Sequence, residues 1–89
     1  MTKEPKINFD ELFEKVTKLN IVLYNDDVNT FDFVILCLTK FCNHTSIQAE
    51  QCAILVDQKG KCHVKSGSYD DLEPIYNALT NATLTVQIE

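Results

Sequence analysis

The chain has 89 residues, of which 45% are hydrophobic, and it contains only two glycines and two prolines. This composition is typical of one small globular domain and excludes a disordered chain. The formal net charge of −5 argues against nucleic acid or an anionic membrane as a partner, because both bind basic surfaces. No run approaches the roughly 20 apolar residues of a membrane span, and residues 1–5 lack the apolar core of a signal peptide. We therefore expect a cytoplasmic protein.

Apolar residues near the N-terminus recur at helical spacing. They predict a short amphipathic helix over residues 8–18. The stripe consists of Phe9, Leu12, Phe13 and Val16. A helix this short is unstable alone, so it either packs on the domain or stays mobile, and the sequence leaves both open. We expect residues 1–19 to form an N-terminal extension and residues 20–89 to form the domain.

The next segment predicts a strand, a turn and a helix. Residues 21–24 are an uninterrupted apolar run with β-branched members, which is typical of a buried strand. Residues 25–29 are polar and turn-prone. Thr30 can cap a helix that ends near residue 43. Its expected core stripe is Phe31, Val34, Leu38 and Phe41.

A second helix is predicted from Thr45 to about residue 59. Thr45 and Gln48 have the spacing of a capping box, and Gly60 is suited to a left-handed helix terminator. The apolar face of this helix is Ala49, Cys52, Ala53 and Val56. Residues 62–65 alternate between apolar and polar side chains, as a half-buried strand does.

The last third of the chain predicts one more helix and one more strand. Asp70 or Asp71 can cap the helix, and Pro74 fits only if it lies in the first turn. The buried face is Leu72, Ile75, Tyr76 and Leu79. Residues 84–88 alternate as a strand. The element order predicts an α+β fold, in which about three helices pack on one face of a small three-stranded, mainly antiparallel sheet.

The cysteines invite a disulfide or a zinc site. They are Cys37, Cys42, Cys52 and Cys62. All four lie in apolar runs, no secretion signal is visible, and no C-x-x-C pair occurs. We expect buried reduced thiols, with a disulfide and a metal site as the alternatives.

Catalytic and metal motifs are missing from the sequence. His44 and His63 have no nucleophile motif beside them, and there is no G-x-S-x-G, H-E-x-x-H or P-loop. Asp26, Asp27 and Asp57 do not have the spacing of an EF-hand. We therefore expect no enzyme activity, no catalytic residues, no metal and no cofactor.

Asn25, Asp26 and Asp27 follow the first strand directly and bring several hydrogen-bond acceptors to one edge of the sheet. Such a cluster suits an ammonium group, which offers three donors and no acceptor. On composition alone, however, an Asx-rich turn is the favoured interpretation over a ligand site.

Longer motifs favour the ligand site over a plain Asx-rich turn. The run 23–27, L-Y-N-D-D, continues into T-F-D-F-V at 30–34, and V-D-Q-K-G-K-C follows at 56–62. At these separations the motifs resemble the signature of the ClpS family, adaptors that deliver N-degron substrates to a Clp unfoldase. The resemblance covers residues 20–66 well and 67–89 loosely.

The resemblance implies the fold of the C-terminal domain of the ribosomal stalk protein. It also implies a site that holds the first residue of a substrate protein, with the ammonium in a polar rim and a bulky side chain in an apolar pocket. The polar residues expected around the ammonium and first peptide unit are Asn25, Asp26, Asn29 and Asp57. The residues expected to line or gate the pocket are Phe31, Val34, Ala53, Val56 and Leu84.

Three features depart from the family pattern. Asp57 stands where the family usually has a histidine that contacts the ammonium. Phe31 and Ala53 stand where the family often has methionines, so a stiff ring replaces a flexible thioether at the mouth of the pocket. The last helix is shorter than is usual in the family, which affects part of the surface that docks on the unfoldase.

These observations favour a monomeric, non-catalytic adaptor with two kinds of partner, a Clp-type AAA+ unfoldase and N-degron-bearing substrates. We expect large apolar or aromatic N-terminal residues to be bound. The main alternative is a docking module of the same fold that serves a Clp or ribosome-associated partner without binding N-degrons. A metal-assisted hydrolase built on Asp26, Asp57 and His63 is a distant third.

Overall fold

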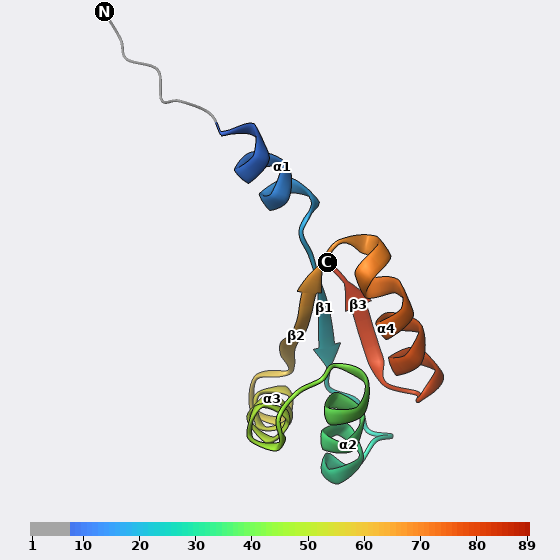
Figure 1. The fold of residues 1–89 in the computed structure, drawn as a ribbon. Helices are drawn as coiled ribbons and strands as arrows, with labels where there is room; N and C mark the ends of the chain where they lie inside the picture. The colour runs from blue at the N-terminus through green and yellow to red at the C-terminus, as the bar shows by residue number, and fades with distance from the viewer. Residues whose placement is uncertain (1–7) are drawn as a thin grey trace, which may run out of the picture.

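The structure is a computed structural model that describes residues 8–89, apart from the side chains of residues 14–16 (Figure 1). Within these described residues, four helices and three strands follow one another. They are α1 (Phe9–Thr17), β1 (Leu19–Tyr24), α2 (Phe31–Phe41), α3 (Ser46–Lys59), β2 (Lys61–Gly67), α4 (Tyr69–Asn81) and β3 (Thr85–Ile88). This order confirms the one predicted from the sequence.

The three strands form one antiparallel sheet in the order β2-β1-β3. Strand β1 is central, and Tyr24 at its end pairs with Lys61 on one side and Thr85 on the other. The register of β1 against β2 shifts between Ile21 and Val22, which marks a bulge. The α+β fold class is therefore confirmed.

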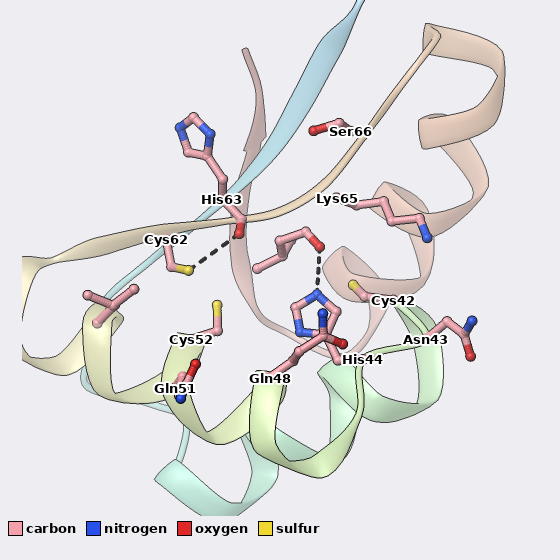
Figure 2. A pocket seen from close by; sticks show the side chains of 12 residues that line it. Cys42, Asn43, His44, Gln48, Gln51, Cys52, Cys62, His63, Lys65 and Ser66 are labelled. Atoms are coloured by element: carbon pink, nitrogen blue, oxygen red, sulfur yellow. Dashed lines mark hydrogen bonds between the residues drawn. The ribbon is translucent and has the colours of Figure 1, made fainter.

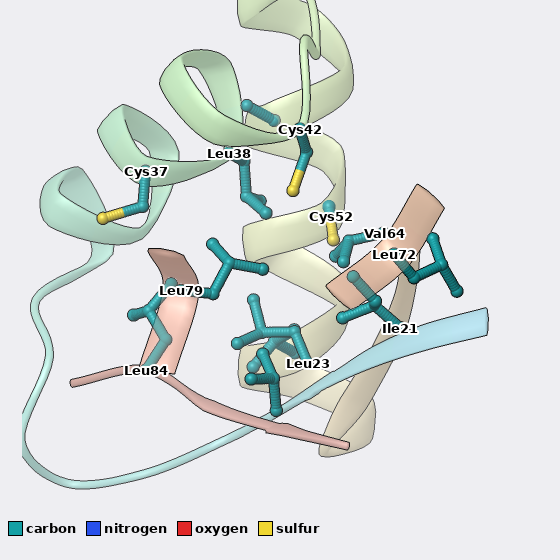
Figure 3. Close-up of a cluster of buried hydrophobic side chains, with 13 residues drawn as sticks. Ile21, Leu23, Cys37, Leu38, Cys42, Cys52, Val64, Leu72, Leu79 and Leu84 are labelled. Atoms are coloured by element: carbon teal, nitrogen blue, oxygen red, sulfur yellow. The ribbon is translucent and has the colours of Figure 1, made fainter. Parts of the chain in front are cut away.

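The core lies between the sheet and the helices α2, α3 and α4 (Figure 3). Helix α3 packs on β2, α4 packs across the sheet, and α2 packs mainly on these two helices. Ile21 and Leu23 point from β1 into this core, where Leu38, Leu72 and Leu79 are fully buried with them. Successive side chains of a strand point to opposite faces, so Ile21 and Leu23 share the face that packs against the helices, while Val22 is buried on the other face.

Local capping chemistry explains where α2 and α3 begin and end. The Thr30 hydroxyl accepts a hydrogen bond from the Phe33 amide at 3.2 Å. Thr45 and Gln48 form the predicted capping box, with bonds of 3.0 and 3.1 Å. Gly60 ends α3 with φ of 92°, a conformation that favours glycine. These three predictions are confirmed.

The start of α4 differs from the prediction. Ser68 is the N-cap, and its hydroxyl accepts from the Asp71 amide at 3.2 Å, so Asp70 and Asp71 lie in the first turn instead. Pro74 lies inside the helix, five residues beyond Tyr69, and not in the first turn. Serine and aspartate cap helices about equally well. The sequence offers both residue types here, and the end of the preceding strand determines which of them becomes the cap. The final strand begins at Thr85, one residue later than predicted.

Helix α1 extends away from the rest of the fold (Figure 1). Phe9 is 75% exposed and Phe13 is 70% exposed, so the apolar stripe is not packed on the domain. The Val16 side chain, predicted as part of that stripe, lies outside the described residues. None of the helices described in residues 8–89 combines the length and apolar character needed to cross a membrane.

Candidate functional site

A cavity of about 70 Å³ lies between the turn after β1 and the helices α2 and α3. Its lining residues are Asn25, Asn29, Phe31, Val34, Ala53, Val56 and Asp57. The structure thus brings together all the predicted site residues except Asp26 and Leu84. These residues are up to 32 positions apart in the sequence, so their convergence is a property of the fold.

One backbone contact places Asn25 opposite the end of α3. The Asn25 amide donates to the Gly60 carbonyl at 3.0 Å, and the Gly60 amide donates to the Val56 carbonyl at 2.9 Å. The end of β1 is therefore joined to the terminator of α3. Asp57, one turn before that terminator, consequently lines the same cavity as Asn25.

The Asp26 carboxylate organises the turn between β1 and α2. It accepts from the backbone amides of Val28 and Asn29, both at 2.9 Å, and from the Asn29 side chain at 3.0 and 3.2 Å. Thr85 on β3 donates its hydroxyl to the same carboxylate at 3.0 Å. These bonds occupy both carboxylate oxygens, so Asp26 positions the rim of the cavity and does not line it.

The hydrogen bonds to the Asp26 carboxylate lower its pKa. Partial burial acts to raise the pKa, but the hydrogen bonds from Asn29, Val28 and Thr85 together outweigh it and hold the pKa below its ordinary value of 3.8. The carboxylate is therefore charged near neutral pH, and its donors are fixed around it.

Asn29 connects this turn to the segment that leads into β3. Its side-chain amide donates to the Thr83 carbonyl at 2.8 Å, and its side-chain oxygen accepts from the Thr83 hydroxyl at 3.4 Å. Thr83 itself has a positive φ of 69°, which is uncommon for threonine. The sequence does not reveal Thr83 and Thr85 as partners of Asn29 and Asp26, because no local motif links them to a turn more than 50 residues away.

The apolar wall of the cavity comes from two helices. Phe31 begins α2 and is 44% exposed, so it is not the core residue that the helical stripe predicted, whereas Val34 one turn later is half-buried. Ala53 and Val56 are buried on α3. Phe31 and Ala53 thus face the same cavity from two different helices.

Leu84 was expected to line the cavity, but it lies in the hydrophobic core. It is 5% exposed and belongs to the main hydrophobic core, where it packs with residues such as Leu79 (Figure 3). Its position directly before β3 turns it towards the helices, so it supports the fold beneath the site.

The chemistry of the cavity is acidic and amide-rich. Within residues 8–89, neither the Asn25 side chain nor the Asp57 carboxylate makes a hydrogen bond to another protein group, and both side chains are exposed. Among the described residues, the lining contains one carboxylate and no lysine or arginine. Such an arrangement can accept hydrogen bonds from a cation on one side and cover an apolar group on the other.

The four cysteines are free thiols. Three are buried as predicted, but Cys62 is only half-buried, because strand β2 forms an edge of the sheet. Within residues 8–89, no group of three or more histidine, cysteine, aspartate or glutamate side chains is arranged to hold a metal ion.

Comparison with known proteins identifies the family. Residues 14–87 match the family described as ATP-dependent Clp protease adaptor protein ClpS, and the chain therefore belongs to the ClpS family. The family predicted from the sequence motifs is confirmed.

Proteins similar to the chain include a ubiquitin ligase and a solved ClpS structure. The E3 ubiquitin-protein ligase ubr-1 of Caenorhabditis elegans is 33% identical over 79 residues, which is 80% of this chain but only 4% of that ligase. The fold resembles that of Agrobacterium tumefaciens ClpS2 bound to L-phenylalaninamide, with a TM-score of 0.75 and 18% identity. That match covers 82% of this chain and 95% of the other.

Proposed function

We propose that the chain is a non-catalytic, cytoplasmic adaptor that binds the N-terminal residue of substrate proteins and delivers them to a Clp AAA+ unfoldase. The observation that carries this proposal is the cavity between α2 and α3, which joins free hydrogen-bond acceptors to an apolar wall. An N-terminal residue has the matching parts, an ammonium group next to a side chain. The structural relative that was solved with L-phenylalaninamide contains a ligand of this kind, which supports the proposal.

The polar rim is suited to the ammonium. Asn25 and Asp57 line the cavity with unengaged side chains, so they are the proposed direct contacts, while Asn29 and Asp26 hold the turn in place. A charge-assisted hydrogen bond contributes roughly 1.5–3 kcal/mol. Acetylation would remove the charge of the ammonium and leave those acceptors without a partner.

The volume of the cavity indicates that it must widen to accept a large side chain. A cavity of about 150 Å³ binds benzene, whereas the cavity here measures about 70 Å³. Phe31 is the first residue of α2 and is 44% exposed. Its ring can therefore rotate outwards more readily than the buried side chains of α3. Phe31 is therefore the proposed gate, and buried area at roughly 25 cal/mol per Å² favours aromatic or large aliphatic residues behind it.

Delivery to the unfoldase rests on the family and not on a contact in the structure. The ClpS family is defined by adaptors of the Clp protease, which supports a Clp-type partner. The alternative is that the chain acts as a docking module of the same fold and binds no N-degron.

Calorimetric titration tests the proposal. The ligands are peptides that begin with Phe, Leu or Met, each with a free or an acetylated N-terminus. We expect micromolar or tighter binding of the free Phe and Leu peptides and at least a roughly tenfold loss on acetylation. Absence of binding to every free terminus would contradict the adaptor and favour the docking module, and metal-dependent hydrolysis of a peptide would contradict both.

A further inference from the structure

A second cavity lies on the other side of α3, in the groove between this helix and β2 (Figure 2). Its volume is about 540 Å³, and it is open to solvent. Three of the four cysteines line it, namely Cys42, Cys52 and Cys62. Cys37 does not, since it lies on α2 away from the groove.

Two of these thiols face each other across the groove. Cys52 comes from α3 and Cys62 from β2, and Figure 2 shows their sulfur atoms pointing towards one another. Burial raises the pKa of the Cys52 thiol, and a hydrogen bond with the Cys62 thiol raises it further. The orientation of the two side chains and their shared place in the groove make them neighbours in the fold.

The thiols differ in their access to solvent. Cys52 is 4% exposed, whereas Cys62 is half-buried and its thiol donates only a weak bond, to the His63 carbonyl at 3.3 Å. Cys42 is 2% exposed, and burial raises its pKa to about 11, although Lys65 opposes this effect. Cys62 is consequently the thiol that a reagent in the groove meets first.

We propose that Cys52 and Cys62 are a redox-sensitive pair, which a low-molecular-weight disulfide such as oxidised glutathione converts into an intramolecular disulfide across the α3–β2 groove. The free thiols of the structure are the reduced state of this pair.

The reaction consists of two thiol–disulfide exchanges. The Cys62 thiolate attacks one sulfur of oxidised glutathione, forms a mixed disulfide and releases a glutathione thiolate. The Cys52 thiolate then attacks the Cys62 sulfur, forms the protein disulfide and releases the second glutathione. The protein thiols lose two electrons and two protons, and oxidised glutathione gains both, becoming two molecules of reduced glutathione.

The position of the pair gives the disulfide a consequence for the candidate site. The loop that it closes runs from residue 52 to 62 and contains Ala53, Val56 and Asp57, three of the residues that line the smaller cavity. Fixing α3 to β2 restrains the backbone that positions these three wall residues, whereas the Phe31 gate on α2 stays free to rotate. This consequence rests on the proposed function, whereas formation of the disulfide does not.

The test uses the full native chain in buffers of oxidised and reduced glutathione, followed by tryptic mapping without reduction. We expect two thiols to be lost, with a mass decrease of about 2 Da, and a cross-link between peptides 41–59 and 62–65. Because Cys42 and Cys52 share the first peptide, the mapping is repeated on Cys42→Ala, which should retain the cross-link. Excess reduced glutathione should restore both thiols.

Several results would overturn the proposal: four unreacted thiols, a cross-link that disappears in Cys42→Ala, or a stable glutathione adduct on Cys62. The Cys62→Ser variant, altered at a half-buried position, should fold and form no cross-link. A separate titration compares the reduced and oxidised proteins with a Phe-initiated peptide, for which we expect several-fold weaker binding after oxidation. If the reduced protein binds no peptide, the proposed function fails while the mapped disulfide stands; equal affinity of both forms would refute the coupling alone.

Discussion

Helix α3 has a cavity on each of two faces, and the two cavities differ in size and in chemistry. The cavity towards α2 measures about 70 Å³ and is lined by acceptors and apolar groups, with one carboxylate and no cation. The groove towards β2 measures about 540 Å³ and is lined by thiols, amides, two histidines and one lysine, with no carboxylate. The smaller cavity is the better candidate for an N-terminal residue, because chemical fit matters more than volume.

The comparison also shows how one helix can serve two roles. Residues 53, 56 and 57 face the smaller cavity, while residues 48, 51, 52 and 55 face the groove. Positions three and four apart share a face of a helix. A substitution on the cavity face of α3 can therefore be compared with a control substitution on the groove face of the same helix.

The largest effect is expected from Ala53→Leu. Ala53 is 3% exposed, and three added carbons would occupy much of the cavity, so peptides that begin with Phe should bind roughly 10–100-fold more weakly. Leu55→Ala, on the groove face of the same helix, should change the affinity by less than about twofold. Titration of both variants measures this; equal losses would show that the two faces do not differ in function.

A smaller effect is expected from Asp57→Ala. If Asp57 contacts the ammonium, every N-degron peptide should bind about tenfold more weakly, whatever its first side chain, because one charge-assisted bond is lost. The matched variant is Gln51→Ala, at an exposed position on the groove face. An unchanged affinity for Asp57→Ala would mean that this residue does not take the role of the family's histidine.

The third prediction concerns the turn that holds the rim. Asp26→Asn should lower the free energy of unfolding by about 1–2 kcal/mol at pH 7, since the carboxylate accepts hydrogen bonds from Val28, Asn29 and Thr85. The folded pKa of Asp26 is below 3.8, so its charged form stabilises the fold above that pH, and the stabilisation is lost as the pH falls through the folded value. Urea unfolding of both proteins should therefore show a difference that shrinks as the pH falls below 3.8. A difference independent of pH would contradict this assignment.

The smallest effect is expected at Gly60, the residue that ends α3. Gly60 has φ of 92°, and a Cβ atom there would meet nothing within 4 Å, so Gly60→Ala introduces backbone strain without a clash. We expect a loss of stability of about 1 kcal/mol and no change in peptide affinity. Thermal unfolding measures the first quantity; a loss above about 3 kcal/mol would indicate a packing role for Gly60.

Local chemistry made most of the fold predictable. Thr30, Thr45 and Gly60 mark helix ends through contacts with residues nearby in the sequence, and the structure has these caps. Pro74 was placed wrongly in a first turn, because its tolerance inside α4 depends on the packing of the whole helix. Family motifs led to the candidate site, but they could not show which residues the fold turns away from it.

Asp26 and Leu84 illustrate that limit. The Asp26 carboxylate is engaged by Thr85, and Leu84 lies in the core, and both facts depend on how β3 returns beside β1. The thiol pair is a similar case. Cys52 and Cys62 belong to a helix and a strand whose packing brings them together, so the sequence predicted only individual thiols.

The most direct test of the central claim is an amide chemical-shift titration of the ¹⁵N-labelled protein with a peptide that begins with Phe. We expect the largest shifts at Asn29, Ala53 and Asp57, around the smaller cavity, and we expect them to disappear when the peptide is acetylated. Shifts centred on Gln51, Cys62 and Lys65 would place the ligand in the groove on the other face of α3 and would contradict binding in the smaller cavity.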